Sequence, residues 1–89
     1  MTEAEALLLI RTYARRGWVR FKRHARDRME ERNVGEEDVE RALIYAAKCG
    51  PDKENPDHWA VVGPDRESAA LLVIVALEEN VIVVTVWGK

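Results

Sequence analysis

The feature that most limits the fold is an unbroken run of nine apolar residues, Ala69–Leu77, in a chain of 89 residues. The run is far shorter than the ~20 residues of a membrane-spanning helix, so it predicts a buried strand and no membrane segment. A strand without a polar side needs cover on both of its faces. Helices packed on one face of a sheet leave the other face to curvature, to another strand or to a second subunit.

The predicted buried strand has a neighbour on each side in the sequence. Residues 58–63 form a short apolar segment that the turn 64–67 separates from the run, and residues 81–87 return after the turn 78–80. Turns as short as these join antiparallel strands. The C-terminal part of the chain therefore predicts a three-stranded antiparallel meander.

The N-terminal part predicts a helix followed by a short strand. Apolar residues recur on one helical face over residues 3–15, and Thr2 and Glu5 have the spacing of a capping box. Gly17 is expected to end this helix. Residues 18–22 then alternate apolar and basic side chains, which suits a short strand or an extended link.

Two more helices are predicted before the meander. The second runs over about residues 23–32 and ends at Asn33, and the third begins after Gly35 with an acidic first turn. Gly50–Pro51 is expected to end the third helix. The fold class is therefore α+β, with the helices packed on one face of the sheet. The apolar stripe expected on the third helix is Val39, Ala42, Leu43, Ala46 and Ala47.

Charge is distributed unevenly along the chain. The net charge is −2, yet residues 11–32 carry nine Lys or Arg against three acidic residues, and residues 33–89 carry five against eleven. Such a basic block binds a polyanion or pairs with the acidic part of its own chain, and both interpretations stay open. The composition, 47% hydrophobic and 34% charged, is that of an ordinary folded protein.

The N-terminus and the cysteine content indicate a cytoplasmic protein. Glu3 and Glu5 stand where a secretion signal carries basic residues, and the apolar residues 7–10 are too few for the core of such a signal. The one cysteine, Cys49, cannot form an internal disulfide, which fits a reducing compartment. We expect Cys49 to be a packing residue.

The residues best suited to chemistry form a row on the second predicted helix. His24, Arg28 and Arg32 follow one another at intervals of four residues, so they fall on one helical face. Two guanidiniums can hold a phosphodiester by bidentate hydrogen bonds, and an imidazole exchanges protons near neutral pH. Metal-free RNA cleavage needs such groups: a base for the 2′-hydroxyl, a cation for the phosphate and an acid for the leaving oxygen.

A structural interpretation of the row stays open beside the chemical one. Glu31 lies three residues after Arg28, and Asp27 lies four residues before Glu31, so a lattice of solvated charges accounts for the same residues. A histidine at the start of a helix also commonly caps or packs. Spacing alone does not decide between the two interpretations.

The predicted sheet supplies further candidates for substrate binding. Thr85 and Trp87 alternate with valines, so they share one face of the last strand. Trp59 and Trp87 could stack a base, although aromatic side chains on sheets more often belong to the core or to an interface. Arg66 could reach a phosphate. The candidate substrate-binding residues are Arg20, Lys22, Arg66, Thr85 and Trp87.

Three segments resemble a known family. Residues 24–43 contain the pattern His-Ala-x-x-Arg-Met-x-x-Arg and an acidic helix start, residues 59–63 read Trp-Ala-Val-Val-Gly, and residues 83–87 include Val-x-Thr-Val. This combination resembles a family of small bacterial domains of unassigned function. The family is similar to the RelE/ParE/BrnT-like toxin–antitoxin ribonucleases and gyrase inhibitors, and the resemblance covers about residues 20–87.

The length of 89 residues predicts a single domain over residues 1–89. With the resemblance, this domain divides into a RelE-like core at 18–87 and a helical extension at 1–16. The resemblance also implies a ribonuclease role and binding to a cognate antitoxin. Toxins of this group are usually basic overall, and this chain departs from them with its net charge of −2. The catalytic residues that the resemblance implies are His24, Arg28 and Arg32.

The leading hypothesis is therefore a toxin-like, metal-free endoribonuclease or RNA-binding protein that uses no cofactor. His58, Asp57 and Cys49 lack metal-ligand spacing with His24, so no metal site is expected. The alternative is a non-catalytic interaction module, in which the basic helix binds an acidic partner or a second copy of the chain.

Overall fold

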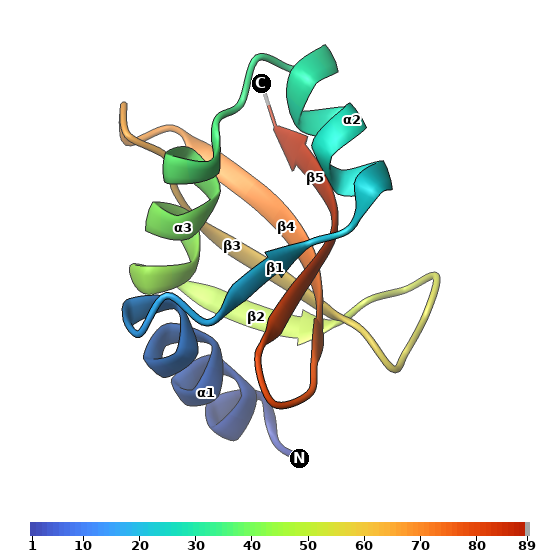
Figure 1. Cartoon of the computed structure of the whole chain (residues 1–89). Coiled ribbons are helices and arrows are strands. Elements are labelled where there is room, and N and C mark those ends of the chain that lie inside the picture. Colours follow the sequence, from blue (N-terminus) through green and yellow to red (C-terminus); the bar gives the residue numbers. More distant parts are fainter. Residues whose placement is uncertain (89) are drawn as a thin grey trace.

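The computed structural model of the chain describes residues 1–88 as a mixed α+β structure with three helices and one five-stranded sheet (Figure 1). The strands lie side by side in the order β1-β5-β4-β3-β2, and only β1 and β5 are parallel. Within the described residues, no helix combines the length and the apolar character needed to cross a membrane. The elements are α1 (Glu3–Arg15), β1 (Val19–Phe21), α2 (Arg23–Glu31), α3 (Glu36–Ile44), β2 (Lys48–Pro51), β3 (Trp59–Pro64), β4 (Ala70–Leu77) and β5 (Val81–Gly88).

The sheet has five strands, whereas the prediction was a three-stranded meander with a short strand or extended link at residues 18–22, and β2 is a strand that the sequence pattern did not predict. The third helix was expected to reach Gly50–Pro51, but α3 ends at Ile44 and β2 pairs antiparallel with β3. Glycine and proline are poor helix formers, and the edge of β3 offers them a partner. The pairing begins where the N–H of Ala47 donates to a β3 carbonyl at 2.8 Å. Cys49 is buried, as expected of a packing residue, and burial raises the pKa of its thiol.

At the other edge of the sheet, β1 forms within the segment expected to be a short strand or an extended link, and it covers only part of its neighbour. Val19–Phe21 aligns in parallel with Val81–Val83, at the start of β5. One residue later, Lys22 donates its N–H to the carbonyl of Val83 at 3.0 Å, and the chain then enters α2. The contacts of α2 with the sheet are mainly to β5. The helix therefore lies along the edge of β5 that β1 leaves uncovered (Figure 1).

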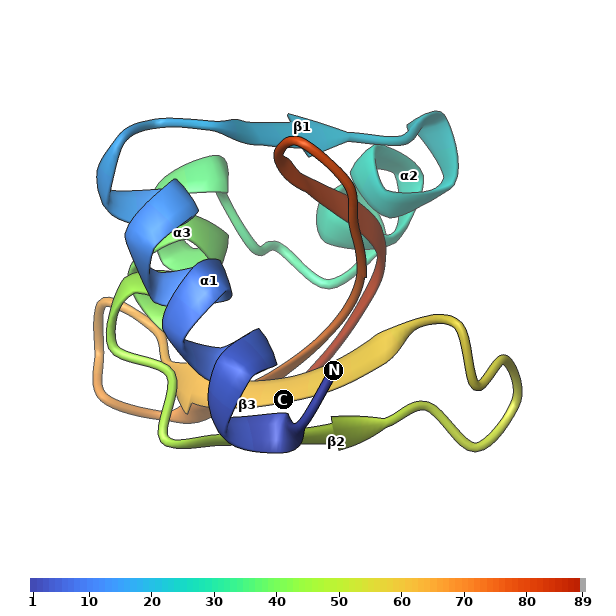
Figure 2. The same cartoon turned by 90° about the horizontal axis from the view of Figure 1, so that it is seen from below.

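The sheet is strongly curved, and the helices do not share one face of it. Figure 2 shows α1 and α3 within the concave side, whereas α2 lies beyond β5. The prediction of single-face packing is therefore wrong for α2, because β1 is too short to occupy the whole edge of β5. Side chains from all three helices still reach one apolar core, which includes Ile10, Met29, Leu43, Val73 and Val83.

A β-bulge in β5 determines which of its side chains face away from α1 and α3. The register shift between Ile74 and Val75 leaves one additional residue, Val84, in β5. A bulge bends its strand and increases the local twist. Beyond the bulge, Thr85 and Trp87 lie on the same face of β5, which confirms the prediction from their alternation.

The N-terminal helix α1 is an integral part of the core. The predicted capping box is present: the Thr2 hydroxyl accepts the N–H of Glu5 at 3.1 Å, and the Glu5 carboxylate accepts the N–H of Thr2 at 2.7 Å. Farther along α1, the Arg11 guanidinium donates to the carbonyl of Ala46. This bond ties α1 to the segment that follows α3. The buried residues of α1 are Ala6, Ile10 and Ala14.

β3 and α3 approach each other closely at Gly63. A Cβ atom at this position would lie 1.9 Å from the carbonyl oxygen of Ala42 and 2.7 Å from its carbonyl carbon. Both atoms belong to the backbone of α3, so no side-chain rotation relieves the overlap. The distance between this helix and the sheet therefore depends on the missing side chain.

We expect Gly63→Ala to lower the free energy of unfolding by about 3 kcal/mol or more, because α3 must move away from β3. Urea denaturation followed by circular dichroism measures the change. Gly35→Ala is the matched control, since its Cβ would meet only a carboxylate oxygen of Asp38, at 3.8 Å. It should cost less than about 1 kcal/mol. Equal stability of Gly63→Ala and the wild type would contradict the close approach.

Candidate functional site

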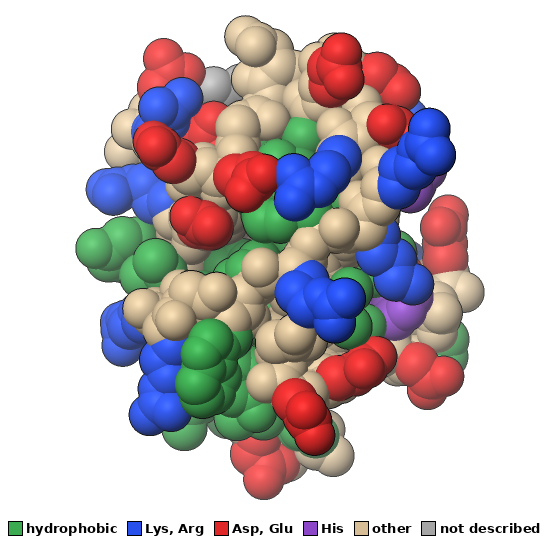
Figure 3. Space-filling view, in the orientation of Figure 1, with side chains coloured by type: hydrophobic (Ala, Val, Ile, Leu, Met, Phe, Trp, Pro, Cys, Tyr) green, Lys and Arg blue, Asp and Glu red, His purple; other side chains and the backbone are tan. Residues whose placement is uncertain are grey.

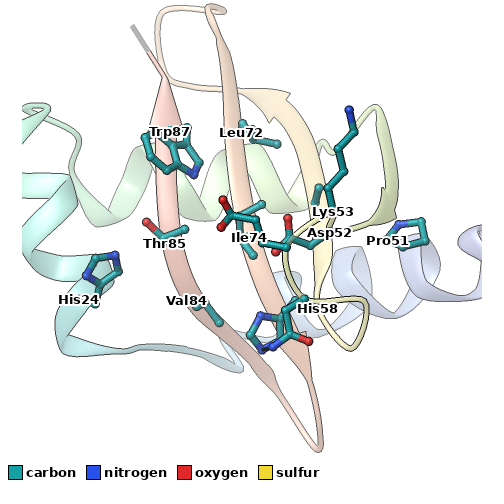
Figure 4. Close-up of a pocket in the computed structure, with 13 residues that line it drawn as sticks. His24, Pro51, Asp52, Lys53, His58, Leu72, Ile74, Val84, Thr85 and Trp87 are labelled. Atoms are coloured by element: carbon teal, nitrogen blue, oxygen red, sulfur yellow. Dashed lines mark hydrogen bonds between the residues drawn. The ribbon is translucent and has the colours of Figure 1, made fainter.

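A groove of about 660 Å³ crosses the face of the sheet opposite α1 and α3. Its floor consists of β3, β4 and β5, and its two walls are α2 with Trp87 and the loop of residues 52–58 between β2 and β3 (Figure 4). Apolar side chains from the three strands make up most of the floor. The floor residues are Ala60, Leu72, Ile74, Val84 and Thr85.

The groove explains how β4 is covered on both faces. Val73 and Val75 point to the helices and are fully buried, and Ile74 on the opposite face is only 6% exposed. The side chains of the groove walls shield this second face. The apolar run that predicted two-sided cover thus supplies the floor of the site.

Of the predicted row on α2, His24 alone lines the groove. It lies in the first turn of α2 and is exposed, beside Thr85 of β5 in Figure 4. Because α2 follows the free edge of β5, its first turn reaches the groove while Ala25 and Met29 turn toward the core. The sequence pattern therefore placed His24 correctly at the border of the apolar contact.

The two arginines of the row contact Trp87. The guanidinium carbons of Arg28 and Arg32 lie 5.3 and 4.8 Å from the centre of the indole ring. At these distances a guanidinium is attracted to the electron-rich face of the ring. Arg28 also lies 3.6 Å from the Glu31 carboxylate, so part of the predicted charge lattice is present. Trp87 remains 41% exposed and lines the groove.

Two buried polar atoms near this contact lack a hydrogen-bond partner among the described residues, Arg32 Nε and Thr85 Oγ1. Leaving a buried donor or acceptor unsatisfied costs about 1–3 kcal/mol. Native proteins retain few such groups, and functional sites are among the places where they occur. Both residues belong to the predicted site, and Trp87 contacts the first and shares a strand face with the second.

Arg20 and Lys22 lie outside the groove. Both are exposed on β1 and on the residue after it, and neither lines the groove. Figure 3 shows basic side chains over β1 and α2, with acidic side chains over the 52–58 loop. Arg26 of the same basic block pairs with Glu36 of α3, so the block is partly neutralised by the acidic half of the chain.

Arg66 and Trp59 have structural contacts instead of the predicted contacts to substrate. The Arg66 side chain pairs with Asp38 at 3.1 Å and with Glu37 at 3.3 Å, and its N–H also donates to Asp38. These bonds join the β3–β4 turn to the start of α3, away from the groove. Trp59 packs against the apolar core.

The residue that the sequence analysis did not connect with the site is His58. It lines the groove from the 52–58 loop. From the sequence, it was considered only for its spacing as a metal ligand. Within residues 1–88, no group of three or more His, Cys, Asp or Glu side chains has an arrangement that would hold a metal ion. The sequence feature that points to a site role for His58 is its position immediately before a strand, at the end of a polar loop.

The chain belongs to the family described as "Domain of unknown function (DUF4258)", whose model matches residues 21–87. This match confirms the predicted membership in a family of small domains without an assigned function. It begins in β1 and includes both walls of the groove. Comparison with curated proteins and with solved structures found no match.

The pairing of Arg66 with Asp38 predicts a pH-dependent stability. Hydrogen bonds from the N–H of Arg66, from the N–H of Gly35 and from the Arg66 side chain hold the pKa of Asp38 below its ordinary value. A carboxyl whose pKa is lower in the folded state stabilises the fold above its unfolded pKa of about 3.9. That contribution disappears as the pH falls through the lower, folded value.

We therefore expect Asp38→Asn to reduce the free energy of unfolding by about 1 kcal/mol at pH 7, since the capping and ion-pair bonds weaken. The difference from the wild type should shrink as the pH falls below about 4. Denaturation curves at several pH values measure it, with Glu79→Gln in the exposed β4–β5 turn as the control for losing one negative charge. A constant difference across the pH range would contradict the assignment.

Proposed function

We propose that this protein is a toxin-like, RNA-binding endoribonuclease that acts without a metal, with a RelE-like fold and with the groove as its RNA site. The observation that carries the proposal is the position of His24, which lines the groove beside Trp87, while Arg28 and Arg32 contact the Trp87 ring. The groove thus contains a histidine and an exposed aromatic ring, and two cations lie against that ring.

The proposed reaction is a transesterification of the RNA backbone. A base removes the proton of the 2′-hydroxyl, the 2′-oxygen bonds to phosphorus, the bond from phosphorus to the 5′-oxygen breaks, and an acid protonates that oxygen. His24 carries one of these two proton transfers. The Arg28 and Arg32 guanidiniums, held against Trp87, supply the positive charge and the N–H donors for the phosphate.

Trp87 supports RNA as the substrate. An exposed indole stacks any nucleobase, and such stacking contributes about 1–3 kcal/mol per base. The apolar floor beside it accepts a further ring. These features favour a short single-stranded segment over a duplex, whose bases are already stacked.

The second candidate function is protein binding without catalysis. Exposed basic residues on β1 and at the start of α2, which do not line the groove, favour an acidic partner such as a cognate antitoxin. A second copy of the chain is the other partner that this function allows, because the C-terminal half of the chain is acidic. The exposed basic residues of this surface are Arg20, Lys22 and Arg23.

We expect the purified protein to cleave a single-stranded RNA oligonucleotide in the presence of a chelator, and His24→Ala to be about 100-fold slower or worse because one proton transfer is lost. Gel analysis of the labelled oligonucleotide measures the rate. Arg23→Ala is the matched control, since this neighbouring residue is exposed and lies outside the groove. The same sequence as DNA should stay intact, because it has no 2′-hydroxyl.

Growth of a bacterial host tests the same proposal in the cell. Induced expression of the wild type should arrest growth, and the double variant His24→Ala with Arg28→Ala should not. Equal growth with both proteins, together with intact RNA in the purified assay, would overturn the ribonuclease proposal. Capture of an acidic protein by the wild type but not by a variant lacking Arg20, Lys22 and Arg23 would then support the second function.

A further inference from the structure

The groove contains a second histidine, on the wall opposite His24. His58 is the last residue of the 52–58 loop, and its side chain lines the same groove. Figure 4 shows the two imidazoles on opposite sides of the β5 segment that carries Val84 and Thr85. These are the two histidines of the chain, and both line one groove although they belong to different halves of the sequence.

Hydrogen bonds give the backbone of His58 a defined position in the loop. The N–H of His58 donates to the Asn55 carbonyl at 2.9 Å, and its carbonyl accepts the N–H of Asp52 at 3.0 Å. The side-chain oxygen of Asn55 accepts the N–H of Asp57 at 3.0 Å, so its amide nitrogen is the atom that faces His58 Nε2, at 3.5 Å. The loop therefore fixes the His58 backbone at the groove wall, and the Asn55 side chain lies against the ring.

Phosphodiester transesterification needs proton-exchanging groups on two sides. The attacking 2′-oxygen and the departing 5′-oxygen lie roughly in line, on opposite sides of the phosphorus. A base that serves the first oxygen cannot also be positioned as the acid for the second while the bonds change. One histidine on each wall of the groove supplies two such groups, with the phosphate between the walls.

We infer that His58 is the second catalytic residue of the groove, and that it exchanges a proton with one reacting oxygen while His24 exchanges a proton with the other. The inference rests on the proposed RNA cleavage. One imidazole takes the 2′-proton, and the other, as imidazolium, gives its proton to the 5′-oxygen. The products are a 2′,3′-cyclic phosphate and a 5′-hydroxyl, so the step needs no further reactant.

The test uses two RNA substrates of one sequence, one with the natural 5′-oxygen at the cleavage site and one with sulfur in its place. Sulfur leaves as a stable thiolate without protonation, so loss of the acid no longer slows the reaction. His24→Ala, His58→Ala and His58→Gln are compared with Asp57→Ala, a control in the same loop whose side chain is exposed and does not line the groove. Thermal denaturation confirms that each variant is folded.

We expect all three histidine variants to cleave the oxygen substrate about 100-fold more slowly than the wild type, or worse. On the sulfur substrate, variants of one histidine should recover to within about tenfold of the wild type, and variants of the other should stay slow. A structural role for His58 does not produce this difference between substrates. The glutamine variant keeps a hydrogen-bonding side chain in the loop, so its slow rate would not reflect lost loop structure.

Two results would overturn the inference alone: His58 variants as fast as Asp57→Ala on the oxygen substrate, or recovery on sulfur for both histidines or for neither. Either result leaves cleavage by the wild type, and hence the proposed function, in place. Absence of cleavage by the wild type on both substrates would overturn the proposed function and this inference with it.

Discussion

The short parallel pairing between β1 and β5 is the contact on which the arrangement of the candidate site depends. It ends at Phe21 and Val83, so the chain turns there and α2 occupies the edge of β5 that has no strand beside it. From this position α2 contributes Met29 to the core on one side and His24 to the groove on the other. A longer β1 would cover the edge with backbone hydrogen bonds and leave no helical wall for the groove.

Local patterns predicted those elements whose stability is largely local. The capping box and the apolar stripe of α1 are properties of adjacent turns, and the bounds predicted from them agree with the structure. β2 is different, because a four-residue strand that contains Gly50 and Pro51 has no periodicity of its own. It exists because β3 presents a free edge, which depends on contacts distant in the sequence. The prediction that all helices pack on one face was wrong for the same reason. The position of α2 depends on how far β1 pairs with β5, which no local pattern reveals.

The candidate site likewise has features that local spacing predicts and features that depend on the fold. Spacing on one helix was enough to group His24, Arg28 and Arg32, because residues four apart share a face. Spacing does not reveal which strand the helix contacts, so the position of both arginines against Trp87 required the fold. Arg66 was predicted to contact a phosphate, but its guanidinium pairs with the Glu37 and Asp38 carboxylates at the start of α3. His58 comes from a loop whose course no periodic pattern describes.

The buried hydroxyl of Thr85 makes the floor of the groove less favourable for folding than an apolar side chain would. A valine would occupy nearly the same space in β5 and would leave no buried oxygen without a partner. Optimising the free energy of folding alone would therefore favour valine at this position, as at its neighbours Val84 and Val86. With threonine at position 85, β5 contributes less to the free energy of folding than it would with valine there. This position lies on the floor of the groove.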